Sequence, residues 1–225
     1  MDQGQAQAEK APGLFRTLGL LFSKPSFWLL SFGAAASSLM AYGLIFWLPS
    51  FFKRSFHLEL QQLSTYYGAI IFFGGVIGVF AGGWLGDVLG KRAKGAYAAV
   101  PAIAFLLAIP CYVAAITSTD LKLAFLLFLA PQALALAWLG PVIAAVQHLV
   151  PSAMRSTASA AFLFINNLIG IGGGTLFLGR LSDYLNPIYG DQSLKMSILV
   201  GLGFYALSAL LLLFASRTLK RDWVA

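Results

Sequence analysis

The stretch GGVIGVFAGGWLGD, residues 74–87, has a second copy in GIGGGTLFLGRLSD, residues 170–183. Both copies follow the pattern Gly-x3-Gly-x4-Gly-x-Leu-x-Asp, and the second copy begins 96 positions after the first (170 − 74 = 96). A period of this length holds about three membrane helices rather than one unit of a short solenoid. The pattern therefore predicts two copies of a three-helix unit, built as a 3+3 inverted repeat.

The composition is that of a chain embedded in a lipid bilayer. Hydrophobic residues make up 59% of the chain and charged residues only 10%, which would leave a soluble domain without a polar surface. Six apolar stretches reach the roughly 20 residues that a helix needs to cross a bilayer: Ser26–Phe52, Leu63–Gly86, Gly95–Thr117, Leu121–His148, Ser156–Gly179 and Met196–Ser216. They are about twice as long as a strand of an outer-membrane barrel. We therefore expect an all-α membrane protein with six transmembrane helices.

The basic residues are distributed unequally between the two sides that these six crossings define. One side holds ten of them, Lys10, Arg16, Lys24, Lys91, Arg92, Lys94, Arg155, Arg217, Lys220 and Arg221, and the other holds five, Lys53, Arg54, Lys122, Arg180 and Lys195. An excess of basic residues in short loops marks the cytoplasmic side, so both termini are predicted to be cytoplasmic. Because these residues are spread over separate loops without a recognition module, the net charge of +7 does not indicate nucleic-acid binding.

The two ends of the chain differ in character from the apolar bundle. Residues 1–25 are predicted to be a cytoplasmic segment with an interfacial lead-in, residues 26–216 the transmembrane bundle, and residues 217–225 a cytoplasmic tail. Residues 1–12 are polar and lack the basic-then-apolar order of a signal peptide. Residues 14–22 predict a short amphipathic helix at the membrane interface.

The strongest motif follows the second apolar stretch, in GGWLGDVLGKRAKG, residues 82–95. It resembles the signature loop of the Major Facilitator Superfamily, Gly-x-x-x-Asp-basic-x-Gly-basic-basic. The matching residues are Gly83, Asp87, Gly90, Lys91 and Arg92, whereas Val88 stands where the family has a basic residue. The resemblance implies half of a major facilitator fold, helices seven to twelve, with this loop biasing the conformational equilibrium. WLPSFFKRSF (residues 47–56) and NNLIGIGGGTLFLGRLSD (residues 166–183) are similar to the Spinster-like branch and also to organic-anion symporters.

Two stripes of small residues predict close helix packing. Gly74 and Gly78 share one helical face, and Asn166, Gly170 and Gly174 share another, which lets a second helix approach closely. These stripes can be satisfied inside a six-helix bundle. The resemblance favours a different partner, since the family's eighth and eleventh helices contact the N-terminal half. The expected partner is therefore the missing six-helix half or a second copy of the chain.

The apolar stretches contain neutral polar residues near mid-depth but no Asp, Glu, Lys, Arg or His there. Ser38, Tyr42, Gln132 and Asn167 are the predicted substrate-binding residues, because the family's seventh and tenth helices line its cavity and Asn167 points about 100° away from Asn166. Asn166 is expected to act in helix–helix contact instead. Ser37 is expected to bond to its own helix.

These features favour one functional class over the others. We expect the C-terminal half of a secondary active transporter that moves a lipid-like molecule or a small organic anion. Its expected location is the cell membrane, with a bacterial inner membrane favoured, where membrane lipids surround it. An enzyme is not expected, since no nucleophile motif, metal cluster or carboxylate pair lies within the apolar stretches, and no cofactor or metal is expected. A non-transporting fragment and an oligomeric channel remain the alternatives.

Overall fold

The computed structural model describes residues 13–224, which are almost entirely helical. The helices are α1 (Leu14–Phe22), α2 (Pro25–Phe56), α3 (Leu60–Arg92), α4 (Ala96–Thr117), α5 (Leu121–Leu136), α6 (Leu139–Gln147), α7 (Arg155–Tyr189), α8 (Ser193–Gly201) and α9 (Gly203–Asp222), with 3-10 turns at Ser152–Met154 and Gly190–Gln192. The all-α prediction is confirmed. Residues 1–12, predicted to be a polar cytoplasmic segment, lie outside the described part of the chain.

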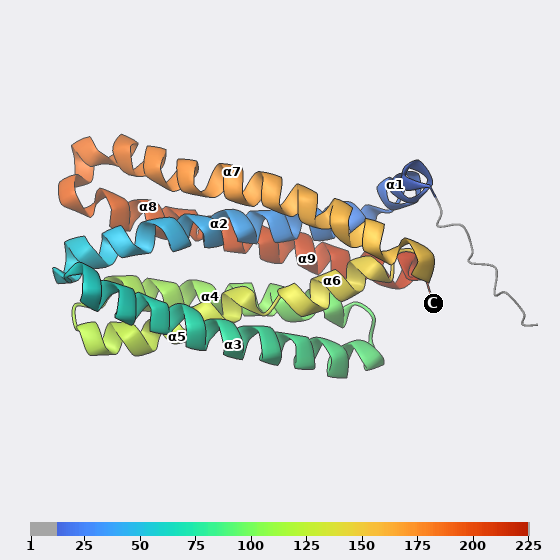
Figure 1. Ribbon diagram of the computed structural model, residues 1–225, viewed down its shortest axis with the longest axis horizontal. Helices are drawn as coiled ribbons and strands as arrows, with labels where there is room; N and C mark the ends of the chain where they lie inside the picture. The colour runs from blue at the N-terminus through green and yellow to red at the C-terminus, as the bar shows by residue number, and fades with distance from the viewer. Residues whose placement is uncertain (1–12, 225) are drawn as a thin grey trace, which may run out of the picture.

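The helices form six passes along one bundle axis. α2, α3, α4 and α7 each make one pass, and the pairs α5 with α6 and α8 with α9 make one broken pass each (Figure 1). By length and apolar composition, five segments of the described chain are able to cross a membrane, and the last of them, Ser152–Asp222, contains two passes joined by the turn at Gly190–Gln192. The six predicted crossings are thus present, and several helices extend beyond their apolar stretches.

The break between α5 and α6 has an identifiable cause. Proline at position i lacks an N–H and its ring clashes with the carbonyl of residue i−4. Pro141 therefore cannot bond to the carbonyl of Ala137, which is where the helix is interrupted. A Cβ added to Gly82 of α3 would collide with that same Ala137 carbonyl oxygen, so the backbone of α3 lies directly against the break.

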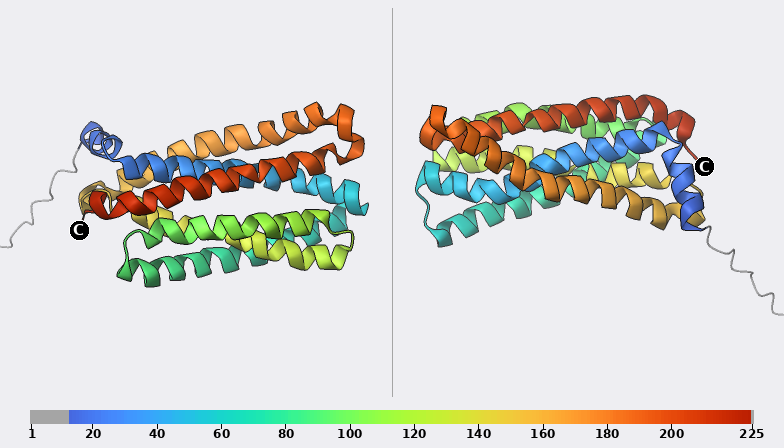
Figure 2. Two further views of the ribbon diagram at one scale, coloured as in Figure 1. Left: turned by 180° about the vertical axis from the view of Figure 1, so that it is seen from behind. Right: turned by 90° about the horizontal axis from the view of Figure 1, so that it is seen from above.

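The six passes form two layers. In Figure 1, α7, α2, α6 and α3 lie toward the viewer, and α4, α8 and α9 lie behind them, as the view from behind in Figure 2 also shows. In the projection of Figure 1, α2 and α6 lie between α7 and α3, and in depth α2 packs on both α7 and α9 (Figure 2). This front layer positions the candidate site described below.

The internal repeat of the sequence is visible in the packing. α2 packs on α7 and α9, and in the same way α5 packs on α3 and α4. The two copies of the glycine motif lie on α3 and α7, which run in opposite directions along the bundle (Figure 1). Asp87 therefore lies near the end of the bundle that carries the chain termini, and Asp183 near the opposite end. The predicted 3+3 inverted repeat agrees with this arrangement.

The segment predicted as a glycine-containing loop is mostly helix. α3 continues to Arg92, so Gly83, Asp87 and Gly90 lie on its last turns, and the connection to α4 consists of Ala93–Gly95. Gly90 serves the packing of α3 against α4, because a Cβ at this position would overlap the ring of Tyr97. Most of the matched residues therefore lie on a helix rather than in the loop that the resemblance implies.

The amphipathic helix predicted at residues 14–22 is present as α1. Its Thr17 and Leu21 are fully buried, whereas Leu14, Phe15 and Phe22 are exposed. Ser23 and Lys24 then lead into α2, with Pro25 at its first turn, where a missing N–H costs nothing. At the other end of the chain, α9 extends six residues beyond residue 216, into the segment predicted to be a cytoplasmic tail.

Candidate functional site

The glycine stripe of α7 packs against α2 of the same bundle. A Cβ on Gly170 would lie 2.8 Å from Cβ of Ser38, and a Cβ on Gly174 would collide with the carbonyl oxygen of Leu39 and lie 3.0 Å from the backbone nitrogen of Gly43. The backbones of α2 and α7 thus touch at this crossing. Only glycine leaves room for so close an approach.

The stripe of α3 makes the equivalent contact with α5. A Cβ on Gly74 would lie 2.6 Å from Cγ of Gln132, and one on Gly78 would overlap the backbone of Ala133. All four glycines are therefore occupied by neighbours within the bundle. The expectation that these glycines face an absent partner is wrong, because a helix face that already touches a neighbouring backbone cannot accept a second one.

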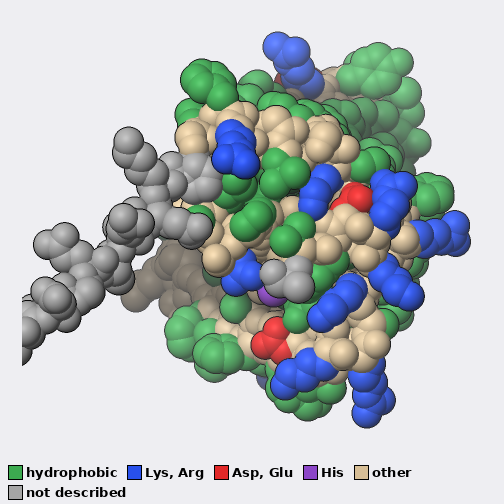
Figure 3. Space-filling view, turned by 90° about the vertical axis from the view of Figure 1, so that its right-hand side faces the viewer, with side chains coloured by type: hydrophobic (Ala, Val, Ile, Leu, Met, Phe, Trp, Pro, Cys, Tyr) green, Lys and Arg blue, Asp and Glu red, His purple; other side chains and the backbone are tan. Residues whose placement is uncertain are grey.

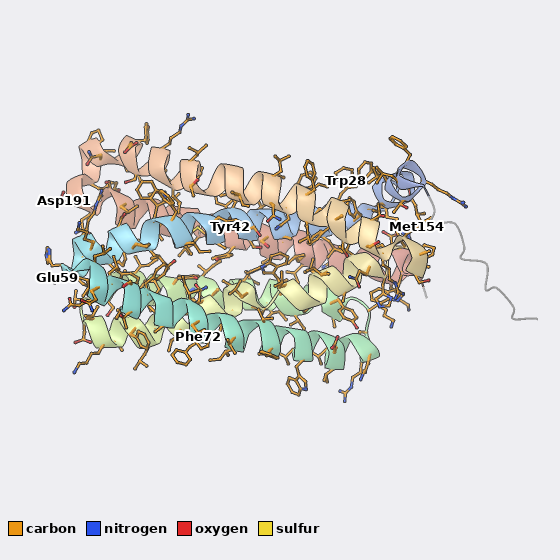
Figure 4. All side chains as sticks on the ribbon, in the orientation of Figure 1. Trp28, Tyr42, Glu59, Phe72, Met154 and Asp191 are labelled. Carbon is orange, nitrogen blue, oxygen red and sulfur yellow. The ribbon has the colours of Figure 1, made fainter. Side chains whose placement is uncertain are left out.

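Close approach of α2 and α7 brings four polar side chains together. Ser38 Oγ donates a hydrogen bond of 2.9 Å to Asn166 Oδ1, and Tyr42 Oη donates one of 3.2 Å to Asn167 Oδ1. Asn166 Nδ2 lies 3.5 Å from Asn167 Oδ1, which links the two pairs weakly. Figure 4 places Tyr42 near the middle of the bundle's length. We name Ser38, Tyr42, Asn166 and Asn167 the polar network.

The four residues of the polar network are not equally accessible. Ser38 is 4% exposed and Asn166 3% exposed, so this pair holds the two helices together. Tyr42 and Asn167 are half-buried and lie on the outer side of the network. Asn166 therefore acts in helix–helix contact, as predicted, although its partner is α2 of the same bundle.

The outer pair retains hydrogen-bonding capacity. A side-chain amide has two donor hydrogens, and within residues 13–224 Asn167 Nδ2 makes no hydrogen bond. The Tyr42 hydroxyl, which donates to Asn167, can still accept. These two side chains thus offer one donor and one acceptor on the outer side of the network.

Gln132 lies outside the polar network. Its side chain is 9% exposed, it is covered by Gly74 of α3, and its Oε1 accepts a 3.4 Å hydrogen bond from Tyr112 of α4. It thus joins α5 to α3 and α4 inside the bundle. Its predicted role as a substrate contact stays a prediction, but the structure does not bring it together with Ser38, Tyr42 and Asn167.

The structure adds two polar contacts that were not predicted from the sequence. Tyr112, fully buried, supplies the partner of Gln132, and Trp47 Nε1 donates a 2.9 Å hydrogen bond to the carbonyl oxygen of Thr175 on α7. The sequence could have indicated these contacts, because the polar atom of a tyrosine or tryptophan in an apolar helix usually has a hydrogen-bond partner. Ser37 donates to the carbonyl of Ala34 in its own helix, as expected.

The signature residues gather at one end of the bundle. This end, which we name the basic end, comprises the starts of α2 and α7, the ends of α3, α6 and α9, and the α3–α4 connection; Lys and Arg side chains are spread across it (Figure 3). Asp87, Lys91 and Arg92 are all exposed there. Within residues 13–224 the one ion pair is Arg221–Asp222, so Asp87 has no charged partner in this part of the chain.

Comparisons with known proteins give the same fold. A bacterial homologue of the human lysosomal transporter Spinster, solved in an inward-facing and unoccupied conformation, matches 100% of this chain and 54% of its own with a TM-score of 0.88 at 26% identity. In its inward-facing and occupied conformation the match covers 91% of this chain and 51% of that one, with a TM-score of 0.80.

Two curated relatives extend the comparison to sequence. An MFS-type efflux pump of Mycolicibacterium smegmatis is 33% identical over 180 residues, which is 80% of this chain and 42% of the pump. Protein spinster homolog 3 of Danio rerio is 28% identical over 222 residues, 90% of this chain and 44% of the relative. This chain spans less than half the length of both relatives.

The family match covers most of the chain. Residues 2–174 fit the Major Facilitator Superfamily, and this range includes the first glycine motif, the basic residues that follow it and the start of the second motif. The Spinster homologue in its unoccupied conformation covers the remaining residues as well. The chain belongs to the Major Facilitator Superfamily and is a half-length, Spinster-like member of it.

Proposed function

We propose that this chain is the C-terminal half of a secondary active transporter that works by alternating access. The observation that supports this most is the match of the whole chain to half of a transporter solved in an inward-facing conformation. In such transporters one bundle rocks against another around a central site. A six-helix bundle with a polar network at mid-length is one side of that arrangement.

The outer pair of the polar network is the part of the proposed site that meets substrate. Asn167 offers a free donor and Tyr42 a hydroxyl with an apolar ring, on helices that also expose large apolar side chains such as Phe46, Phe164 and Leu168. This combination suits an amphipathic, lipid-like molecule whose head group accepts hydrogen bonds, with a small organic anion as the second class. The apolar parts of the described helices carry no charged side chain at this depth, so a coupling ion, such as the proton of a symporter, would act on the partner half.

The proposed partner is a second six-helix bundle, either the missing N-terminal half or another copy of this chain. α3 is the least buried of the long helices, although it contacts α5, α4 and α6. Its exposed large side chains include Phe72, Phe73, Phe80 and Trp84. Lipid covers some of this surface, and the part beside α6 is where a second bundle would pack.

We further propose that the basic end faces the cytoplasm. The positive-inside rule supports this orientation, because nine of the fourteen Lys and Arg residues in residues 13–224 belong to α1, the helix ends and the connection at that end, and such side chains are spread over its surface (Figure 3). Both described ends of the chain, α1 and the end of α9, lie there. A bacterial inner membrane is the favoured location.

Reconstitution tests the half-transporter proposal. The purified chain in liposomes, under an imposed proton gradient, is expected to take up neither lysolipids nor organic anions above the level of empty liposomes. The same chain assembled with a six-helix N-terminal half should give saturable, gradient-dependent uptake. Saturable uptake by the chain as a monomer would contradict the proposal, whereas a non-saturating current from the chain alone would favour an oligomeric channel.

Point variants test the site within the transporting assembly. Asn167→Ala removes the free donor, and a hydrogen bond to a charged acceptor contributes about 1.5–3 kcal/mol, so KM should rise about ten- to a hundredfold. Ser37→Ala is the matched control, because that hydroxyl bonds only within its own helix and KM should not change. Equal KM values for Asn167→Ala and the parent assembly would place the substrate elsewhere.

A further inference from the structure

The segment Asp222–Val224 at the end of α9 contacts the end of α6 and the start of α2. The backbone N–H of Val224 donates a 2.7 Å hydrogen bond to the carbonyl of His148, which follows α6. Asp222, 8% exposed, accepts a 3.1 Å hydrogen bond from the backbone N–H of Ser26 in the first turn of α2. The segment thus ties α9 to the end of α6 and to the start of α2.

Lys24 connects the same three elements. Its ammonium donates a 2.6 Å hydrogen bond to the carbonyl of Leu149, next to His148, and another of 2.6 Å to the carbonyl of Asp222. Both acceptors are carbonyls near the ends of helices, where cations are favoured. We name Asp222–Val224 together with these contacts the clasp.

Trp223 is the hydrophobic part of the clasp. Its ring is stacked with that of His148 at a centroid distance of 4.4 Å and with that of Tyr97 on α4 at 5.4 Å. The ammonium of Lys94, from the α3–α4 connection, lies 4.8 Å from the centroid of the indole ring. The clasp therefore also holds the connection that follows the signature residues.

His148 lies where the addition of a second proton to its neutral imidazole ring is unfavourable. Its Nδ1 atom is buried and has no hydrogen-bond partner within residues 13–224, so protonation would leave a charged donor without an acceptor. Burial lowers the pKa of His148, the nearby charges of Arg155 and Lys94 lower it further, and the backbone of Val224 opposes them in part. An imidazolium stacked on Trp223 would gain about 0.5–1 kcal/mol as a cation–π contact, which acts in the opposite direction.

We infer that the clasp is a proton-sensitive lock on the basic end, closed while His148 is neutral and released when His148 takes up a proton. The released segment frees α9 from α2 and α6 and frees Lys94 from the indole ring. The basic end of the bundle then becomes looser without any change in the core. This inference concerns the bundle alone and does not rest on the proposed transport.

The sign of the pH dependence follows from linkage. A histidine whose pKa is lower in the closed clasp than in the open one makes the open form bind more protons, so closure strengthens as pH rises. The stabilisation is fully present above the ordinary pKa of about 6.5 and is lost as pH falls through that value toward the lower pKa of the closed form. The other ionisable groups around the clasp are Lys24, Lys94, Tyr97, Arg155, Arg221 and Asp222. Free Asp titrates near 3.9, below this range.

Hydrogen exchange measures the lock directly. The full chain in lipid nanodiscs is compared at pH 7.5 and pH 5, and protection factors are corrected for intrinsic exchange, for a peptide covering residues 219–225. Protection of the Val224 amide should fall on acidification by up to about thirtyfold, the limit at pH 5 for a group whose pKa in the open form is about 6.5. Peptides from the opposite end, around Asp191, should keep their protection. Unchanged protection at Val224 would overturn the inference.

Three variants assign the effect to His148. His148→Phe keeps an aromatic ring against Trp223 and the backbone carbonyl but cannot be protonated, so Val224 should stay protected at both pH values. His57→Asn removes the other of the two histidines, at the left-handed residue that ends α2, where asparagine is tolerated, and should behave as the parent chain. Arg155→Gln should shrink the loss at pH 5, because it brings the pKa of His148 closer to its ordinary value. Acid release that persists in His148→Phe would mean that another group, such as Lys24, titrates, and would refute the lock.

Discussion

The crossing of α2 and α7 makes a stability prediction with a control on the same helix. Gly174→Ala places a methyl group where the carbonyl oxygen of Leu39 already lies and 3.0 Å from the backbone nitrogen of Gly43. Both are backbone atoms, which cannot rotate away as a side chain would. Gly172→Ala makes the same chemical change two residues earlier, where nothing lies within 4 Å.

The two variants should differ in sign. Alanine is favoured over glycine in a helix by about 1 kcal/mol, so Gly172→Ala should be stabilising by up to about that amount. Overpacking at Gly174 costs about 1–3 kcal/mol. Separation of the helices also weakens the hydrogen bonds Ser38–Asn166 and Tyr42–Asn167, each of which contributes about 0.6 kcal/mol in a membrane protein. After the helix-propensity gain is subtracted, Gly174→Ala should destabilise the bundle by about 1–3 kcal/mol.

Equilibrium unfolding in mixed micelles checks this prediction. The parent chain and both variants are titrated with denaturing detergent, and far-UV circular dichroism follows the loss of helix. We expect the free energies of unfolding of the two variants to differ by about 2–4 kcal/mol, with Gly174→Ala below the parent. Equal stability of the two variants would show that the backbones of α2 and α7 are not in contact. It would also refute the hydrogen bonds of the polar network, which depend on that contact.

Three further predictions use other parts of the bundle. In a chain with Cys111→Ala, a cysteine at Ala93 should resist an impermeant external thiol reagent while one at Asp191 reacts, because the basic end is proposed to be cytoplasmic; the opposite labelling pattern would reverse the orientation. Asp87→Asn in the transporting assembly should change the transport rate at equal expression, because Asp87 is exposed and lacks a charged partner within residues 13–224; an unchanged rate would remove its conformational role. A double-mutant cycle of Ser38→Ala and Asn166→Ala should give a coupling energy of about 0.6 kcal/mol, and a value near zero would show that the 2.9 Å contact does not hold the helices together.

The architecture was predictable because it depends on features that are written along the chain. The six passes follow from the length of the apolar stretches, and the inverted repeat follows from the 96-residue spacing of two glycine motifs. The end of each helix was less predictable, since hydrophobicity marks the membrane-embedded part only. α7 extends ten residues beyond Gly179, through polar residues that a helix tolerates in water or in the head-group region.

The partners of the small residues were not predictable from periodicity. Helical spacing shows that Asn166, Gly170 and Gly174 share a face, but it does not say which helix covers that face. The resemblance to the family favoured a helix outside the bundle, whereas the structure places α2 there. The prediction likewise grouped Gln132 with Ser38 and Tyr42 because they lie at a similar depth in the membrane. Residues at one depth can nevertheless lie on different sides of a bundle, as these do.

The difference between the two copies of the repeat is what points to a binding site. Both copies bring a glycine-bearing helix against its neighbour beside a side-chain amide, Gln132 in one and Asn166 in the other. The Gln132 amide is buried and its oxygen accepts a hydrogen bond from Tyr112, so this copy of the repeat exposes no side-chain amide at this crossing. Around Asn166 the next residue, Asn167, stays half-buried with a free donor. Packing of the two helices alone does not require that second amide, and for this reason we propose that α2 and α7 recognise the substrate.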